Sequence, residues 1–211
     1  MTISNGYITQ QALKDYVGDG IQGDRDNDAI DNAVNAASRL IDQHCKRRFY
    51  ADGSATARTY WPLDSRLCLV DDISTTTGLV VKVDRGDDGT YEETVSSSDY
   101  QLMPLNGVVD GLSGWPYTRI VLPGTVTYPS KTALRPPVQV TANWGWAAVP
   151  DAVEQACKII AHQLFAMKDA AFGVSVFGAD GFTRKVGTIP TQAQELLALY
   201  RRGAAVVGAI A

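Results

Sequence analysis

The sequence predicts an α+β protein in which a small helical bundle, of about four helices, is interrupted by an inserted antiparallel β-rich lobe. Near both ends of the chain apolar residues recur every three or four positions, as in helices with one buried face. Between them, residues 55–145 are rich in Thr, Val, Tyr and turn residues, in short runs typical of strands. We therefore expect residues 1–54 and 146–211 to form one helical domain and residues 55–145 to form the lobe.

Two helices are predicted in the N-terminal part. The first covers residues 8–17, with Thr9 as its N-cap. The second runs from about Asp26 to Arg47, with carboxylates at its start and the cations Lys46, Arg47 and Arg48 at its end, as the helix dipole favours. Its apolar face consists of Ile30, Ala33, Val34, Ala37, Leu40, Ile41 and Cys45.

The acidic segment DRDNDAID, residues 24–31, is the densest group of possible metal ligands in the sequence. A calcium loop starting at Asp24 requires glycine at its sixth position and glutamate at its twelfth, where this chain has Ala29 and Asn35. The same carboxylates are expected at the start of a helix, where Asp24 or Asp26 can cap free N–H groups. We therefore predict no metal site.

Seven strands are expected in the lobe, and turn residues mark their limits. The segment 84–91 contains an Asp-Gly turn between two of them, and residues 104–118 form a loop. Pro136 and Pro137 cannot lie inside a central strand, because neither has an N–H to donate. The strands are predicted at residues 57–61, 66–70, 78–83, 91–95, 99–103, 118–122 and 138–144.

The C-terminal part is helical again. Pro150 and Asp151 are start signals for a helix that extends to residue 170 and is apolar on several sides, which places it in the centre of the core. A Gly-rich loop at 173–187 leads to a last helix at 191–202. The main stripe of the central helix consists of Val153, Ala156, Cys157, Ile160, Leu164 and Met167.

Composition excludes several classes of protein. The net charge of −4 argues against a protein that binds nucleic acid by neutralising phosphates. The polar N-terminus does not resemble a signal peptide, and no apolar run reaches the roughly 20 residues of a membrane span. Cys45, Cys68 and Cys157 are too scattered for a disulfide framework and are predicted to be small buried hydrophobes. We expect a soluble, reduced protein without a membrane partner.

No catalytic, cofactor-binding or metal-ligating residues are predicted. His44 and His162 lie on predicted helices without partners at zinc spacing, and the sequence has no Gly-x-Ser-x-Gly elbow, phosphate loop or dinucleotide fingerprint. The tripeptide Arg-Gly-Asp at 85–87 is interpreted as a chance match in a turn. The sequence therefore argues against an enzyme.

Two features suggest assembly instead. The C-terminal tail, residues 203–211, is apolar and uncharged, so it either extends the last helix into the core or docks on another protein. The Gly-rich stretch is long for a loop in a compact domain and could become ordered on assembly. The candidate contacts with a partner are Arg201, Arg202, Val206, Val207 and Ile210.

Several segments in order resemble one family. These are residues 7–18 and 29–49 at the start, 99–106 and 115–122 in the lobe, and 138–165 and 195–202 at the end. Together they resemble the phage head–tail connector proteins, the adaptor or head-completion proteins of long-tailed bacteriophages. The lobe is larger here than in the minimal members of that family.

The resemblance implies a virion protein assembled in the host cytoplasm. Family adaptors form a ring of about twelve copies beneath the portal and above the stopper or tail-completion protein. Their ring extends the channel through which DNA passes without specific binding, and their C-terminal region often docks on the portal. One alternative is that this chain is itself the stopper or tail-completion protein. A second alternative is a glycan-binding module that uses Tyr60, Trp61, Trp115, Tyr117, Trp144 and Trp146.

Overall fold

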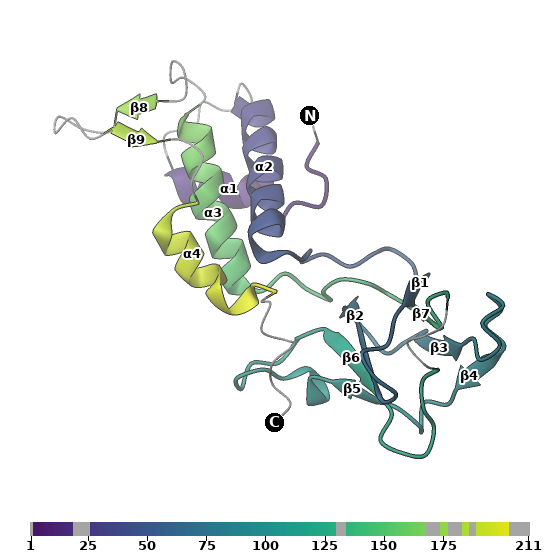
Figure 1. The fold of residues 1–211 in the computed structure, drawn as a ribbon. Coiled ribbons are helices and arrows are strands. Elements are labelled where there is room, and N and C mark those ends of the chain that lie inside the picture. Colours follow the sequence, from purple (N-terminus) through teal and green to yellow (C-terminus); the bar gives the residue numbers. More distant parts are fainter. Residues whose placement is uncertain are drawn as a thin grey trace. The chain divides into compact units, whose positions relative to one another are not determined.

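The computed structural model describes residues 2–18, 26–129, 134–167, 174–176, 183–185 and 189–202 (Figure 1). The chain divides into two compact units. Residues 1–47 and 149–211 form the helical unit, and residues 48–148 form the β unit. Helices and antiparallel sheets are both present, so the predicted α+β class is confirmed.

The described part of the helical unit is built around one central helix. Helix α3 (Asp151–Ala166) contacts α1 (Gln10–Val17), α2 (Asn27–Cys45) and α4 (Thr191–Leu197), and α4 continues in a 3₁₀ turn at Ala198–Tyr200. This confirms the central position predicted from the apolar sequence of α3. Its fully covered face differs slightly from the predicted stripe, because Phe165 is buried while Leu164 and Met167 are half-buried.

The starts of the helices follow the predictions only in part. Thr9 caps α1, since its Oγ1 accepts a hydrogen bond of 3.1 Å from the Ala12 N–H. Asp26 occupies the N-cap of α2, but its carboxylate accepts no capping hydrogen bond, so the predicted cap is wrong for this residue. Asp24 lies outside the described residues. Pro150 is the N-cap of α3, so this helix begins at Asp151, one residue later than predicted.

A buried serine fastens the N-terminal segment to the helices. Ser38 is fully buried on α2 and donates a hydrogen bond of 2.8 Å to the Val34 carbonyl. Its Oγ also accepts from the Tyr7 N–H at 3.1 Å and lies 3.7 Å from the Cys157 sulfur of α3. Because each of these groups is satisfied, the polar side chain is accommodated in an apolar interface.

All seven strands predicted for the β unit are confirmed, with ends that differ by a few residues. They form two antiparallel sheets, with the orders β1-β7-β3-β4 and β2-β6-β5. Pro136 and Pro137 precede β7, as expected, and leave β7 free to pair with β1 on one side and β3 on the other. The strands are β1 (Thr56–Tyr60), β2 (Leu67–Ile73), β3 (Val80–Val83), β4 (Glu93–Val95), β5 (Gln101–Met103), β6 (Tyr117–Val121) and β7 (Val138–Ala142).

The core of the β unit draws on both sheets. Along β7 alternate residues are buried, as expected for a strand with one covered face, and Val138, Val140 and Ala142 point into the core. Residues of β2 and β6 supply the opposite side, among them Cys68 and Ile120. The buried apolar cluster of both sheets consists of Cys68, Val70, Ile73, Val81, Val83, Val95, Ile120, Leu122, Tyr128, Val138, Val140, Ala142 and Trp144.

The Gly-rich stretch is not a simple loop. Two short strands within it, β8 (Val174–Val176) and β9 (Thr183–Lys185), pair antiparallel. The prediction of a loop through 173–187 is therefore wrong at these two segments. Valine and threonine favour strands locally, and the surrounding glycines concealed this signal.

Candidate functional site: a basic surface on the helical unit

The described residues contain few candidates for chemistry. No group of three or more His, Cys, Asp or Glu side chains within them is arranged to hold a metal ion. His162 is exposed on α3, where it packs edge-on against Tyr16 with ring centroids 5.8 Å apart. It also borders a pocket of about 310 Å³ between α3 and α4, whose other lining residues are Ile159, Gln163, Ala166, Pro190, Thr191 and Gln192. Among the described lining residues there is no cysteine or carboxylate beside the imidazole.

The three cysteines are buried and free, which confirms their predicted role as small apolar residues. Burial raises the pKa of the Cys45 thiol and of the Cys157 thiol to about 11, and that of the Cys68 thiol to about 12. Thiolate is the reactive form, so all three thiols are poor nucleophiles in the folded protein.

We predict that the native protein resists thiol labelling. At pH 8 an aromatic disulfide reagent should modify essentially none of the three cysteines within minutes, because the thiols are both covered and protonated. In denaturant all three should react at once. Rapid labelling of one native cysteine would show that its surroundings open readily.

The aromatic residues proposed as a glycan platform do not share one exposed face. Trp144 and Trp146 are buried, and the Trp115 ring packs against Trp146 with centroids 5.0 Å apart. Tyr60 packs against Trp144 with centroids 5.8 Å apart, whereas Trp61 is 45% exposed. Most of these rings therefore contribute to packing, as their size favours.

The Arg-Gly-Asp tripeptide is fixed within its turn. Arg85 Nη2 lies 3.0 Å from Glu93 Oε1, and the same guanidinium group donates to the Thr127 carbonyl. The Asp87 carboxylate accepts hydrogen bonds from the N–H groups of Leu134 and Arg135. Both charged side chains stabilise the β3–β4 connection, which supports the interpretation of a chance match.

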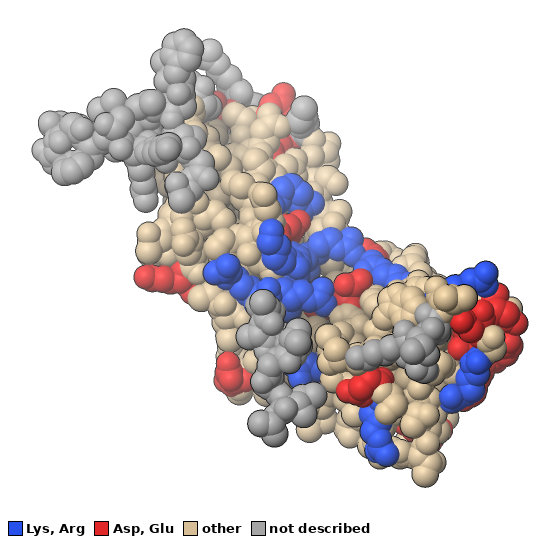
Figure 2. Space-filling view, viewed as in Figure 1, with Lys and Arg blue, Asp and Glu red and all other residues tan. Residues whose placement is uncertain are grey.

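Two basic segments that are distant in the sequence meet on the helical unit. The Arg202 N–H donates a hydrogen bond of 2.8 Å to the Cys45 carbonyl at the end of α2. This contact places residues 46–47 beside residues 201–202. We call the cations Lys46, Arg47, Arg201 and Arg202 the basic surface. Figure 2 shows Lys and Arg side chains gathered where the ends of α2 and α4 lie in Figure 1.

The centre of the basic surface carries cations without counter-charges. Lys46 adopts a left-handed conformation at the C-cap of α2 and is exposed, as is Arg201. Within the described part of the chain, neither has a carboxylate at ion-pair distance. The ends of two helices lie here, and the partial negative charge of their last carbonyls favours these cations.

His44 lies beside these two cations in the last turn of α2. Its pKa is lowered from 6.5, first by burial and then by the positive charges of Arg201 and Lys46. The Nε2 atom is covered and has no hydrogen-bond partner among the described residues. His44 therefore lies beside two exposed cations, and negative charge brought to Lys46 and Arg201 would oppose the lowering of its pKa.

We predict that His44 makes folding depend on pH. A histidine with a depressed folded pKa contributes stability above its unfolded pKa of 6.5 and loses it as pH falls through the folded value. The free energy of unfolding should therefore fall below about pH 6.5, and His44→Gln should reduce this dependence. His162→Gln is the control, because His162 is exposed. Equal urea midpoints for wild type and His44→Gln from pH 7.5 to 5 would contradict the prediction.

The structure places only part of the predicted contact set. Arg201 and Arg202 lie on the basic surface, whereas Val206, Val207 and Ile210 fall outside the described residues. The sequence analysis explained the basic residues after α2 by the helix dipole alone. It did not predict that they lie close to Arg201, or that these cations lower the pKa of His44. Two basic clusters, each at the end of a helix of the same predicted bundle, were the feature of the sequence that could have indicated this surface.

This chain is similar to known proteins in its fold and not in its sequence. No family model matches the sequence, and no curated protein matches it. Solved structures do match, over 95% of this chain and 92% of theirs. One is a chain from the neck of an empty gene transfer agent particle computed with C6 symmetry, with a TM-score of 0.56 and 15% sequence identity. Another is a chain from the virion of a native gene transfer agent particle, with a TM-score of 0.55 and 16% identity.

The fold is similar to that of a gene transfer agent neck chain. A third match comes from the neck of the native particle computed with C12 symmetry, at a TM-score of 0.50 and 16% identity. The likeness extends over nearly the whole of both chains, so it includes helices as well as sheets. Among the described helices of this chain, none has the length and apolar character to cross a membrane.

Proposed function

We propose that this chain is a structural virion protein, a head–tail connector adaptor whose copies form a ring beneath the portal. The ring extends the DNA channel toward the tail. The observation that supports this most strongly is the fold likeness to gene transfer agent neck chains over 95% of the sequence. The order of segments that resembles the adaptor family is an independent argument from the sequence.

A ring is the assembly that this proposal requires. The similar neck structures were computed with sixfold and twelvefold symmetry, and a rotationally symmetric neck is built from head-to-tail contacts between identical copies. The net charge of −4 suits a channel that DNA slides through, because an acidic wall repels phosphates. We propose that the β unit contributes to contacts with neighbouring copies.

The position within the neck distinguishes the adaptor from its alternatives. A stopper or tail-completion protein would also belong to a neck, and the fold likeness favours neither layer. Immobilised portal rings and immobilised tail tubes separate the two roles directly. The adaptor proposal predicts retention on portal rings, and retention on tail tubes alone would refute it in favour of the stopper role.

The apolar tail provides a sharper test. Removal of residues 203–211 should weaken binding to portal rings while leaving circular dichroism and the melting temperature unchanged. A truncated chain that binds portal as well as the full chain would exclude the tail as the docking segment. If truncation instead lowers the melting temperature, the tail belongs to the protein's own core.

A further inference from the structure

We propose that the basic surface of one copy binds the acidic β3–β4 connection of the next copy. This inference rests on the proposed ring and assigns the two surfaces that meet within it. The acidic partner is residues 84–93, which we call the acidic turn. It contains five acidic residues and one basic residue, in the sequence DRGDDGTYEE. Figure 2 shows acidic side chains gathered at this connection.

Two carboxylates of the acidic turn are exposed without a cation bonded to them. Asp88 and Glu92 are exposed, and Asp88 Oδ1 accepts a hydrogen bond of 2.7 Å from the Thr90 N–H. This hydrogen bond is the first cause of the lowered pKa of Asp88. Glu93 is different, since it is paired with Arg85. Asp88 and Glu92 therefore remain available for a partner.

The turn that carries these carboxylates is fixed by several hydrogen bonds. The buried Asp84 carboxylate accepts from the Gly89 N–H at 2.7 Å, and the Asp87 carboxylate accepts from two N–H groups of residues 134–135. Arg135 also donates to the Asp88 carbonyl oxygen, and its positive charge contributes to the lowered pKa of the Asp88 carboxylate. A turn fixed in this way binds with little loss of conformational entropy.

The basic surface lacks the negative charges that the acidic turn offers. Lys46 and Arg201 are exposed cations without a carboxylate among the described residues, and His44 offers a covered nitrogen without a hydrogen-bond partner. Two carboxylates from a neighbour would pair with Lys46 and Arg201, and their negative charge would act on the covered His44 ring without contacting its Nε2. Each copy carries both surfaces, so the contact joins unlike faces and can repeat from copy to copy until the ring closes.

A protein partner fits this surface better than DNA does. The basic surface contains four cations, whereas the whole chain has a net charge of −4. Binding to DNA through phosphates needs a larger basic face that releases many counterions. A paired set of a few carboxylates and cations is instead typical of an interface in which charge sets the register.

Charge reversal and mixing test this contact. Native mass spectrometry and sedimentation velocity of the full chain should show salt-sensitive self-association. Lys46→Glu with Arg201→Glu, and separately Asp88→Lys with Glu92→Lys, should each weaken association by about tenfold or more. The two reversed proteins mixed together should associate again, because each then offers the other an opposite charge.

Matched controls separate this contact from a general effect of charge. Lys14→Glu with Lys158→Glu, and Asp15→Lys with Glu195→Lys, change the net charge equally at other sites of the helical unit and should leave association unchanged. Nuclear magnetic resonance of His44 provides a second readout, since carboxylates brought beside it should raise its pKa. The chain has only two histidines, so His162→Gln assigns the signal.

Three other results decide whether the basic surface of one copy binds the acidic turn of the next. Failure of the mixed proteins to associate would overturn the inference, as would wild-type protein that stays monomeric at low salt. Loss of binding to a DNA duplex on reversal of Lys46 and Arg201, with self-association intact, would assign the basic surface to DNA instead. Retention on portal rings is measured separately, so the proposed adaptor role can stand when this contact fails.

Discussion

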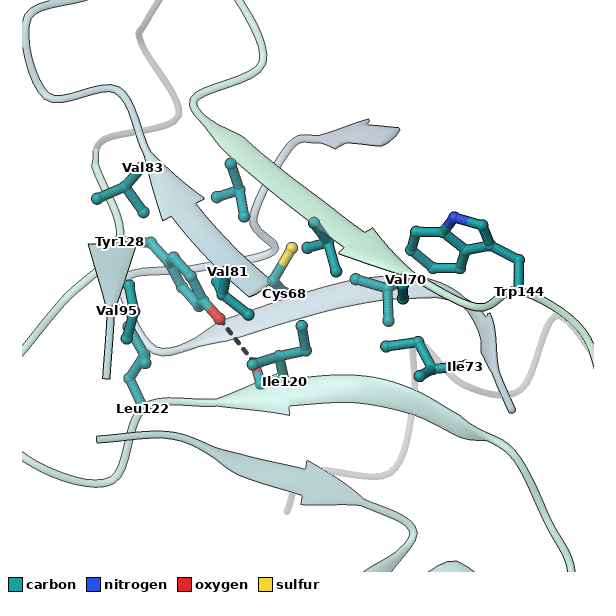
Figure 3. Packing of buried hydrophobic residues seen from close by; sticks show 13 residues of the cluster. Cys68, Val70, Ile73, Val81, Val83, Val95, Ile120, Leu122, Tyr128 and Trp144 are labelled. Atoms are coloured by element: carbon teal, nitrogen blue, oxygen red, sulfur yellow. Dashed lines mark hydrogen bonds between the residues drawn. The ribbon is translucent and has the colours of Figure 1, made fainter. Parts of the chain in front are cut away.

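Trp144→Ala should lower the free energy of unfolding of the protein by about 4 kcal/mol, the cost of a large aromatic removed from a packed core. Trp144 is fully buried, and its indole N–H donates to the Thr56 carbonyl at 2.8 Å. The Arg58 guanidinium carbon lies 4.5 Å from the ring centroid. Figure 3 shows Trp144 at one end of the buried cluster, near Val70 and Ile73.

The substitution removes several interactions at once. It leaves a cavity beside Ile73 and Tyr60. The Thr56 carbonyl loses the hydrogen bond from the indole, and the Arg58 guanidinium loses its contact with the aromatic ring. Urea denaturation followed by far-ultraviolet circular dichroism measures the loss. Trp61→Ala is the matched control, because Trp61 is 45% exposed and its removal should change stability by about 0.5 kcal/mol or less. Equal effects of the two substitutions would contradict the position of Trp144 in the core.

Gly145→Ala should have an even larger effect and prevent the β unit from folding normally. A Cβ atom at this position would overlap the Tyr50 carbonyl oxygen and would lie 2.8 Å from its carbonyl carbon and 3.0 Å from the Ala51 Cα. These neighbours are backbone atoms and cannot rotate away. The glycine also has a φ of +109°, a conformation that side chains strongly disfavour.

A series of three glycine substitutions separates the two causes. Gly111 has a φ of +79° but open space around it, so Gly111→Ala should cost about 1–2 kcal/mol from backbone strain alone. Gly53 has neither a positive φ nor a close neighbour, so Gly53→Ala should be nearly neutral. The urea midpoint should be highest for Gly53→Ala, lower for Gly111→Ala and lowest for Gly145→Ala. If Gly145→Ala matches Gly111→Ala, the overlap with Tyr50 is relieved at no cost.

Most of the secondary structure could be predicted because local signals agreed with tertiary packing. The Thr9 cap, the apolar stripe of α2 and the two prolines before β7 are each decided by a few neighbouring residues. Signals that depend on partners were harder to interpret. Asp26 stands at a helix start without capping it, and β8 and β9 occur where glycines obscured their strand preference.

The candidate site was predictable only in its parts. Arg201 was predicted to be a candidate contact with a partner, and the cations at the end of α2 were predicted from the helix dipole. Their proximity is created by one backbone hydrogen bond, from Arg202 to Cys45, between segments that are far apart in the sequence. No pattern within either segment predicts that bond. The effect of this proximity on His44 is likewise visible only when the helices are packed.

The chain enters and leaves the β unit at points that are tied together. β1 and β7 pair antiparallel, with Thr56 opposite Ala142. Outside this pair, Asp52 precedes β1 and Trp144 follows β7, and the Asp52 N–H donates a hydrogen bond of 2.7 Å to the Trp144 carbonyl. Because its two ends are joined in this way, the β unit is an insertion whose length can change without moving its ends apart. A longer or shorter insertion whose ends pair in the same way would leave the connections to α2 and α3 unchanged.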